Sequence, residues 1–136
     1  MIEFRPLVES DLPLLRTWLE RDHVRLWWRE PIERELAEDM SGRHVILVDG
    51  RPAGMIQSYE TEVDLLIGEE ELTGRGLGAQ ILSQFVEEEM SGDVAFALVE
   101  EGNRSSWRAF EKAGFRHVRD VEENGLPHRL MRRDRG

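Results

Sequence analysis

The sequence of 136 residues contains no cysteine. This absence excludes disulfide bonds, thiolate nucleophiles and metal sites built on cysteine. The histidines lack the spacing of metal ligands, so we predict no metal site from His23, His44, His117 and His128. The chain has no apolar run near the roughly 20 residues of a membrane span, and its N-terminus lacks the apolar core of a signal peptide. We therefore expect a soluble cytoplasmic protein with no membrane partner.

Positive charge is scarce as well. The chain carries 28 acidic against 18 basic side chains and a formal net charge of −10 at pH 7. Phosphate contacts need clustered lysine and arginine, so this charge argues against nucleic acid as a partner. Solubility is the simpler explanation of the charge, and attraction of a cationic small molecule, such as a polyamine or an amino sugar, is the alternative.

The sequence does contain enough apolar residues for a core, because 40% of the residues are hydrophobic and four are tryptophan. Its length suits one domain over residues 1–136. Alternation and turn residues predict strands at residues 2–7, 44–48, 55–59, 61–67, 94–99, 115–121 and 127–132. Helical spacing predicts a helix capped by Ser10 and ending near residue 22, followed by helices at 23–28, 31–40, 77–90 and 103–113. This order predicts a mixed α/β fold in which helices cover the sheet.

Two hairpin turns and the C-terminal end complete the expected organisation. Asp49-Gly50 and Asn124-Gly125 are residue pairs typical of tight hairpin turns. The basic end, Arg129 to Arg135, is predicted to be a solvated tail rather than a binding patch. No repeat or linker interrupts the chain.

A glycine-rich stretch lies between the apolar strand at 63–67 and the helix that follows it. Alternating glycines allow unusual dihedral angles and let main-chain N–H groups approach a ligand closely. A helix start adds unpaired N–H donors and a partial positive charge. We therefore predict an anion site, most often for phosphate, made by Thr73, Gly74, Arg75, Gly76, Leu77, Gly78 and Ala79.

Three phosphate-binding motifs compete for this stretch, and a plain turn that starts a helix is the remaining alternative. The P-loop is excluded because it needs Gly-Lys followed by Ser or Thr. A dinucleotide fingerprint is formally present as Gly74-x-Gly76-x-x-Ala79, but it lies mid-chain. The acidic residue expected roughly 20 residues on is also not matched, because Asp93 comes too soon and Glu100, which follows the apolar run, lacks the partner strands of that fold. The third motif is the pyrophosphate loop of acyltransferases, with Thr73 where Gln or Arg is usual. The acidic run Glu69-Glu70-Glu71 must point away from such a phosphate.

A second motif follows the apolar strand at 94–99 and reads Asn103-Arg-Ser-Ser106-Trp-Arg-Ala-Phe110-Glu-Lys112-Ala-Gly114-Phe115. Together with the glycine stretch it resembles the GNAT N-acetyltransferase superfamily, whose late motif reads Asn-x-x-Ala-x-x-x-Tyr-x-Lys-x-Gly-Phe. The resemblance implies a central, mostly antiparallel sheet of about six or seven strands, splayed between strands 4 and 5 and flanked by about four helices.

Within the superfamily the chain looks most like the aminoglycoside 6'-N-acetyltransferases. The similarity is carried by His23-Val-Arg-Leu-Trp27-Trp28, by Gly54 to Tyr59 and by Asp64 to Gly78. It implies transfer of an acetyl group from acetyl-CoA to an aminoglycoside amine by direct attack in a ternary complex, and hence antibiotic resistance. Another amine acceptor (a polyamine, a small metabolite or a protein lysine) and a non-catalytic acyl-CoA-binding module are the alternatives. We expect a monomer or homodimer.

The resemblance also implies where acetyl-CoA lies. Its pantetheine would run beside Leu66 and Ile67, where a main-chain N–H can stabilise the oxyanion, and residues 73–79 would hold its pyrophosphate. The second motif would add contacts from Asn103, Ser106 and Phe110, while Trp107 is expected to pack in the core. Phe110 stands where the superfamily usually has a tyrosine, which is often assigned as the general acid that protonates the leaving thiolate. Phenylalanine cannot donate a proton, so this role is excluded for residue 110. A thiol with a pKa of about 8.5 can still leave as its thiolate.

Asp64 is the predicted catalytic residue. It interrupts the apolar strand at 63–67, where burying an unpaired carboxylate would be costly. Such a carboxylate can anchor the substrate ammonium or accept its proton, and an exposed strand end is the alternative reading. The predicted acceptor site also contains an aromatic wall for a cationic ligand and two polar contacts: Trp27, Trp28, Tyr59, Gln57 and Glu100.

Overall fold

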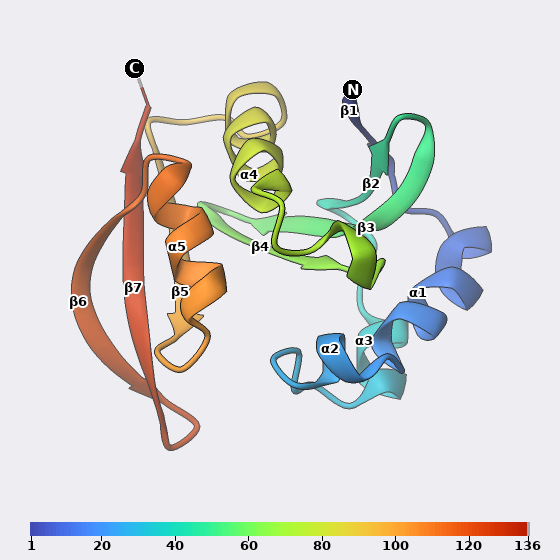
Figure 1. Cartoon of the computed structure of the whole chain (residues 1–136), viewed down its shortest axis with the longest axis horizontal. Helices are drawn as coiled ribbons and strands as arrows, with labels where there is room; N and C mark the ends of the chain where they lie inside the picture. The colour runs from blue at the N-terminus through green and yellow to red at the C-terminus, as the bar shows by residue number, and fades with distance from the viewer. Residues whose placement is uncertain (136) are drawn as a thin grey trace. The chain divides into compact units, whose positions relative to one another are not determined.

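The computed structural model describes residues 1–135, and its elements follow the predicted order (Figure 1). The strands are β1 (Ile2–Pro6), β2 (Arg43–Val48), β3 (Arg51–Tyr59), β4 (Glu62–Ile67), β5 (Val94–Glu100), β6 (Arg116–Glu123) and β7 (Leu126–Asp134). The helices are α1 (Leu12–Leu19), α2 (Asp22–Arg25), α3 (Ile32–Ala37), α4 (Leu77–Glu88) and α5 (Arg104–Lys112), with 3₁₀ turns at Glu9–Asp11 and Glu70–Leu72. Over residues 1–135, none of the helices combines the length and apolar character needed to cross a membrane.

The strands form one mixed sheet in the order β1-β2-β3-β4-β5-β7-β6. Pairing is antiparallel between β1 and β2, β2 and β3, β5 and β7, and β6 and β7. β4 runs parallel to β5, with Glu62 opposite Phe96. This confirms the predicted mixed, mostly antiparallel sheet, while the splay between strands 4 and 5 stays a prediction.

The chain divides into two compact units, so its organisation as one domain also stays a prediction. Unit 1 contains Met1–Gln57 and Leu65–Leu72. Its core forms where the apolar face of α1 meets buried residues of β2, β3 and β4, and the members are Leu7, Leu15, Trp18, Leu19, Val24, Val45, Met55 and Leu66. Burial of this apolar area is the main force that holds the unit together.

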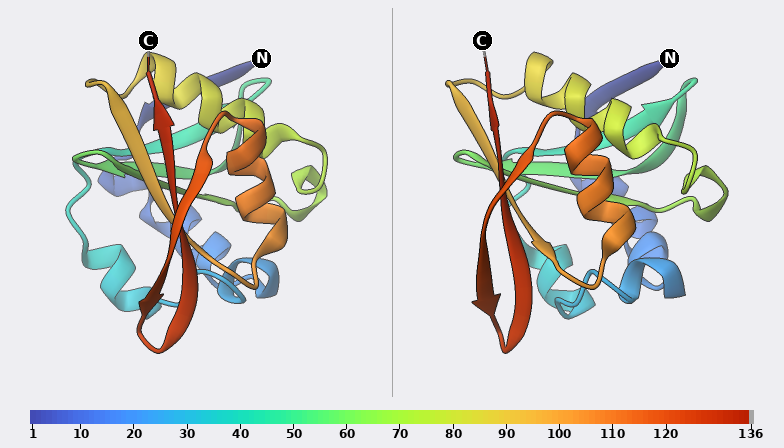
Figure 2. Two further views of the ribbon diagram at one scale, coloured as in Figure 1. Left: turned by 90° about the vertical axis from the view of Figure 1, so that its left-hand side faces the viewer. Right: turned by 60° about the vertical axis from the view of Figure 1, so that its left-hand side comes forward.

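Unit 2 contains Ser58–Asp64 and Thr73 onward. Figure 2 shows its strongly twisted β6–β7 hairpin with α5 beside it. α4 and α5 pack against each other, and the buried side chains of the unit include Phe85, Phe110, Phe115 and Met131. The rings of Phe110 and Phe115 meet edge to face with their centroids 5.0 Å apart, an arrangement that the aromatic quadrupole favours.

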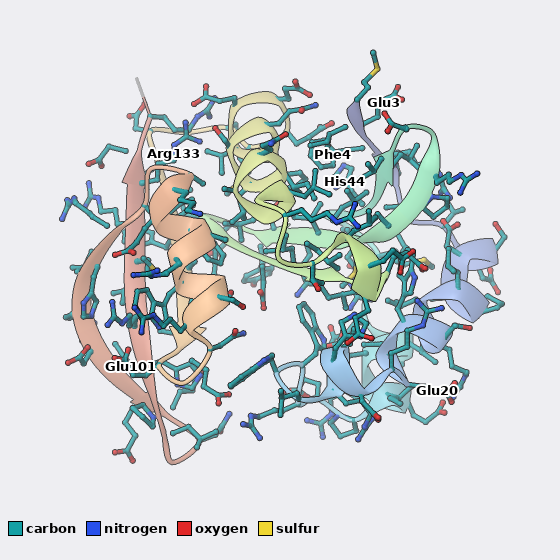
Figure 3. The ribbon with its side chains drawn as sticks, in the orientation of Figure 1. Glu3, Phe4, Glu20, His44, Glu101 and Arg133 are labelled. Atoms are coloured by element: carbon teal, nitrogen blue, oxygen red, sulfur yellow. The ribbon has the colours of Figure 1, made fainter. Side chains whose placement is uncertain are left out.

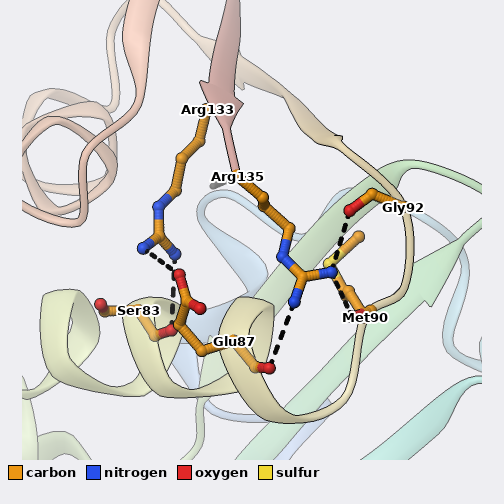
Figure 4. Close-up of polar contacts among 6 residues, drawn as sticks. All are labelled: Ser83, Glu87, Met90, Gly92, Arg133 and Arg135. Carbon is orange, nitrogen blue, oxygen red and sulfur yellow. Dashed lines mark hydrogen bonds and ion pairs between the residues drawn. The ribbon is translucent and has the colours of Figure 1, made fainter.

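The C-terminal end is a strand, so the prediction of a solvated tail for residues 129–135 is wrong. β7 pairs with β5 on one side and β6 on the other. Arg133 Nη2 donates to Glu87 at 2.6 Å, and Arg135 Nη1 donates to the main-chain oxygens of Met90 and Gly92 at 2.7 and 3.0 Å (Figure 4). Cations are favoured at a helix C-terminus because the last carbonyls lack intrahelical partners. The arginines therefore join the strand to the end of α4.

The first helix and α3 have boundaries that differ from the prediction for identifiable reasons. Ser10 does not cap the first helix, because a 3₁₀ turn precedes it and Asp11 occupies the cap position without a side-chain cap hydrogen bond. The Asp11 carboxylate instead accepts from Val8 N at 2.9 Å and from both terminal nitrogens of Arg5 at 2.9 Å. α3 is also shorter than predicted, since Glu38 takes an extended conformation.

Candidate functional site

The glycine-rich turn opens directly into α4. Gly74 and Gly76 have φ of 74° and 76°, a left-handed conformation that L side chains rarely adopt. Gly76 is the N-cap residue, no side chain caps the helix, and no acidic residue lies in its first turn. A Cβ added to either glycine would meet nothing within 4 Å. The turn therefore combines an uncapped helix N-terminus with open space beside its main chain, which suits an anion.

The Glu69 carboxylate, in the acidic run that precedes this turn in the sequence, is bound by two side chains of unit 1. Trp18 Nε1 donates to Glu69 Oε2 at 2.7 Å, and Arg21 Nη1 lies 3.1 Å from the same oxygen. The indole hydrogen bond, followed by Arg21, holds the pKa of the Glu69 carboxyl below its usual value. The expectation that this run points away from a phosphate stays a prediction.

The end of β4 is fixed by two side chains from the start of α2, its N-cap residue Arg21 and His23. His23 Nε2 lies 2.9 Å from Ile67 O, and Arg21 Nη1 donates to Gly68 O at 2.8 Å. Because a carbonyl can only accept, the proton of His23 must lie on Nε2. Leu66 is buried and Ile67 is half-buried. The sequence predicts no role for His23, because a hydrogen bond to a distant main-chain oxygen produces no recognisable residue pattern.

The second motif forms the start of α5. Asn103 is its N-cap residue, and its main-chain N donates to Glu100 O at 2.9 Å, which brings these two predicted site residues into one turn. The Asn103 side chain makes no cap hydrogen bond. Ser106 is half-buried, whereas Phe110 is only 1% exposed and packs on Phe115. A contact of Phe110 with a cofactor stays a prediction.

A cluster that the sequence did not reveal supports this turn from β7. Arg129 donates to both carboxylate oxygens of Glu101, at 2.5 and 3.1 Å, and its guanidinium lies 3.8 Å from the Trp107 ring centre. Trp107 Nε1 donates to Glu101 O at 3.1 Å. Figure 3 shows Glu101 just beyond β5, far along the strands from Arg133. Trp107 is half-buried under an arginine, so its predicted placement in the core is wrong.

Asp64 and Tyr59 are exposed. Tyr59 is 77% exposed at the end of β3. Asp64 alternates along β4 with the buried Val63, so its carboxylate belongs to the exposed face of the strand. The argument from the cost of a buried carboxylate therefore does not apply, and the catalytic role of Asp64 stays a prediction.

Trp27, Trp28 and Gln57, predicted to contact the acceptor, belong to unit 1. Trp27 and Trp28 are half-buried beyond α2, and Trp28 packs against the core cluster. The Trp28 Nε1 atom is buried and has no hydrogen-bond partner among residues 1–135. Gln57, near the end of β3, accepts a hydrogen bond from Arg43 at 3.0 Å. Within the same described residues, no group of three or more metal-ligating side chains gathers.

A family comparison fits this geometry. The family described as "Acetyltransferase (GNAT) domain" matches residues 7–123, most of the chain. The chain belongs to the GNAT acetyltransferase family. The glycine turn and the Asn103 turn both lie inside the matched segment, as the sequence resemblance implied.

Individual GNAT proteins resemble this chain over most of its length. Aminoglycoside N(6')-acetyltransferases type 1 from Klebsiella pneumoniae and Serratia marcescens are each 25% identical over 84% of this chain and 73% of their own length. Aminoglycoside acetyltransferase AAC(6')-Ib, solved with ribostamycin and coenzyme A, has a TM-score of 0.87 at 23% identity, covering 98% of this chain and 93% of its own. The aminoglycoside N(6')-acetyltransferase from Legionella pneumophila has a TM-score of 0.84 at 18% identity over 98% and 91%. These structures share the fold of the GNAT chain.

Proposed function

We propose that the chain transfers an acetyl group from acetyl-CoA to a primary amine of an aminoglycoside, the 6'-amino group. The observation that carries this proposal is the glycine turn at the start of α4, with Gly74 and Gly76 in the left-handed region and open space beside them. In this proposal the main chain of residues 73–79 binds the pyrophosphate of acetyl-CoA, and Arg75 offsets the missing contact at Thr73.

Amide formation from a thioester needs an uncharged amine held against the carbonyl, and much of the acceleration comes from holding the two together. In the proposed reaction the amine attacks the acetyl carbonyl directly. A main-chain N–H near Leu66 or Ile67 stabilises the oxyanion. The hydrogen bonds of His23 to Ile67 O and of Arg21 to Gly68 O support the role of this main chain in oxyanion stabilisation, because they fix its position.

Asp64 binds the substrate ammonium or accepts its proton in this proposal. Its exposure favours a group that meets a ligand from solvent. Phe110 cannot donate a proton, and the thiolate of coenzyme A leaves without an acid at that position. An aminoglycoside acceptor is supported by the similar aminoglycoside acetyltransferases that were solved with ribostamycin and kanamycin. The net charge of −10 also supports it, because a negative protein attracts polycations.

The test is a thiol-release assay with acetyl-CoA and a panel of amines that contains kanamycin, spermidine and a lysine peptide. We expect release with kanamycin. Release with spermidine or the peptide alone would assign the chemistry to another amine. Coenzyme A binding without release for any amine would leave an acyl-CoA-binding module.

The role of Asp64 is tested by Asp64→Asn, for which we expect turnover with kanamycin to fall by roughly 10²-fold at unchanged coenzyme A affinity. Glu62→Gln is the matched control, because Glu62 is an exposed carboxylate on the same strand and the same face. Turnover that is equal in the two variants would remove Asp64 from the mechanism.

A further inference from the structure

A buried ion pair lies in unit 1. Arg43, the first residue of β2, is 4% exposed, and Glu35 of α3 is 6% exposed. The guanidinium contacts the Glu35 carboxylate, and its Nη1 donates to Glu35 O at 3.0 Å. Burial of a charge is tolerated when it is paired and hydrogen-bonded. These contacts hold the arginine in one position.

The remaining nitrogen of Arg43 determines the orientation of a neighbouring amide. Arg43 Nε lies 3.0 Å from the side-chain oxygen of Gln57. Arginine has donors and no acceptor, so the atom that faces it must be the amide oxygen and not the amide nitrogen. The orientation of the Gln57 amide is therefore set by the chemistry of Arg43.

The other half of this amide is left with hydrogen atoms to donate. Gln57 Nε2 donates to no protein atom in residues 1–135, and the side chain is half-buried, so it reaches the surface. Trp28, in the same unit, also has an indole N–H without a partner there. Both predicted acceptor-site residues therefore offer hydrogen-bond donors.

We propose that Arg43, held by Glu35, is a positioning residue that fixes Gln57 as a hydrogen-bond donor to a hydroxyl or ether oxygen of the acceptor substrate. This inference rests on the proposed function. A protonated polyamine has donors and no acceptor, so it gains no hydrogen bond from the Gln57 amide nitrogen. An amine that carries sugar oxygens gains a hydrogen bond, and the Glu35–Arg43–Gln57 chain thus acts on specificity rather than on the transfer step.

The first test measures kinetics with kanamycin. We expect Gln57→Leu to raise the KM for kanamycin about tenfold, the effect of one lost hydrogen bond, with kcat and coenzyme A affinity unchanged. An unchanged KM would overturn the inference and leave the proposed function standing. A wild-type protein that does not acetylate kanamycin would instead overturn the proposed function.

The second test observes the Gln57 side-chain amide by NMR. The side-chain ¹⁵N–¹H₂ signals of Gln57 are assigned by their loss in Gln57→Leu and followed by NMR while kanamycin is added to the coenzyme A complex. We expect these signals to shift with kanamycin and to stay in place with spermidine. Bound kanamycin without a shift, or an equal shift with spermidine, would overturn the donor role.

The positioning role of Arg43 is tested with the paired variant Glu35→Leu/Arg43→Leu, which removes both charges and leaves neither uncompensated. We expect the same rise of about tenfold in KM, and no further rise when Gln57→Leu is added, because the two changes remove one interaction. Additive effects would overturn the role. Arg43→Lys, which keeps the charge but not the planar fork, provides a folded alternative with an intermediate KM.

Discussion

Glycine and arginine are used differently in the two units. In unit 1, a Cβ on Gly68 would lie 2.1 Å from the Trp18 ring, and Arg43 is enclosed by Glu35 and Gln57. In unit 2, a Cβ on Gly76 would meet nothing within 4 Å, and Arg133 reaches a half-exposed carboxylate on α4. Gly68 is needed for space, whereas Gly76 is needed for a dihedral angle.

The difference shows how local packing decides whether a substitution is costly. A filled interior makes every added atom costly and every charge dependent on its partner. An open turn tolerates added atoms and leaves main-chain donors for a ligand. Substitution of an enclosed residue such as Gly68 should therefore change stability, and substitution at the glycine turn of unit 2 should also change cofactor binding.

The largest effect is expected from breaking the buried pair. Arg43→Leu leaves the Glu35 carboxylate buried without a partner, so we expect the free energy of unfolding to fall by roughly 3–5 kcal/mol. Urea unfolding measures this change. The paired variant Glu35→Leu/Arg43→Leu is the control and should lose much less. Equal losses would show that volume, and not the unpaired charge, matters at this site.

The two glycines give a direct comparison. Gly68→Ala places a methyl group in the Trp18 ring, and we expect a loss of roughly 1–3 kcal/mol in the free energy of unfolding. Gly76→Ala should lose about 1–2 kcal/mol from the positive φ and should also bind coenzyme A more weakly. Calorimetry measures both quantities.

Gly125→Ala is the control for this comparison. Gly125 has the same φ of 76° as Gly76 and also has nothing within 4 Å of an added Cβ, but it lies in the β6–β7 hairpin. We expect the same loss of stability with unchanged coenzyme A affinity. A drop in affinity in both variants would remove the special role of the turn at α4.

A smaller effect is expected where β7 meets α4. Arg135→Met removes hydrogen bonds to the main-chain oxygens of Glu87, in the last turn of α4, and of Met90 and Gly92 just after it, and we expect a loss of about 0.3–1 kcal/mol. Arg133→Met breaks a half-exposed pair with Glu87, and its loss should be about 1 kcal/mol or less and should shrink in high salt. Losses as large as that of Arg43→Leu would contradict the contrast between the units.

The smallest effect is expected on the stability of the protein at low pH. The hydrogen bond from Arg5 lowers the pKa of Asp11, and the hydrogen bond from Arg129 lowers the pKa of Glu101. A depressed acid pKa contributes stability that is present above the unfolded value of about 4 and is lost as the pH falls through the folded value. Asp11→Asn should therefore flatten the loss of stability below about pH 4, measured by urea midpoints. Glu101→Gln, at a more exposed pair, should flatten it less.

Much of the fold could be predicted because its signals are local. The turn pairs at 49–50 and 124–125 take positive φ at both residues, as a two-residue hairpin turn requires. The apolar run at 94–99 is β5, with alternate residues buried on one face. The glycine turn also has the conformation that its composition predicts.

The failures share a cause in distant contacts. The basic composition of residues 129–135 predicts a tail, yet antiparallel pairing with β5 makes residues 129–134 part of a strand. Trp107 has the spacing of a core residue, but Arg129 of β7 covers its ring. The partners of Glu69 in the acidic run, Trp18 and Arg21, come from distant positions in the chain.

The sequence by itself determined the element order, the hairpin turns, the glycine turn and the family, because each depends on residues close together in the chain. Only the tertiary structure decided that Asp64 is exposed, that Phe110 is enclosed and that Arg43 orients the Gln57 amide. Burial and hydrogen-bond direction are set by residues from other elements, and a pattern along one chain does not contain them.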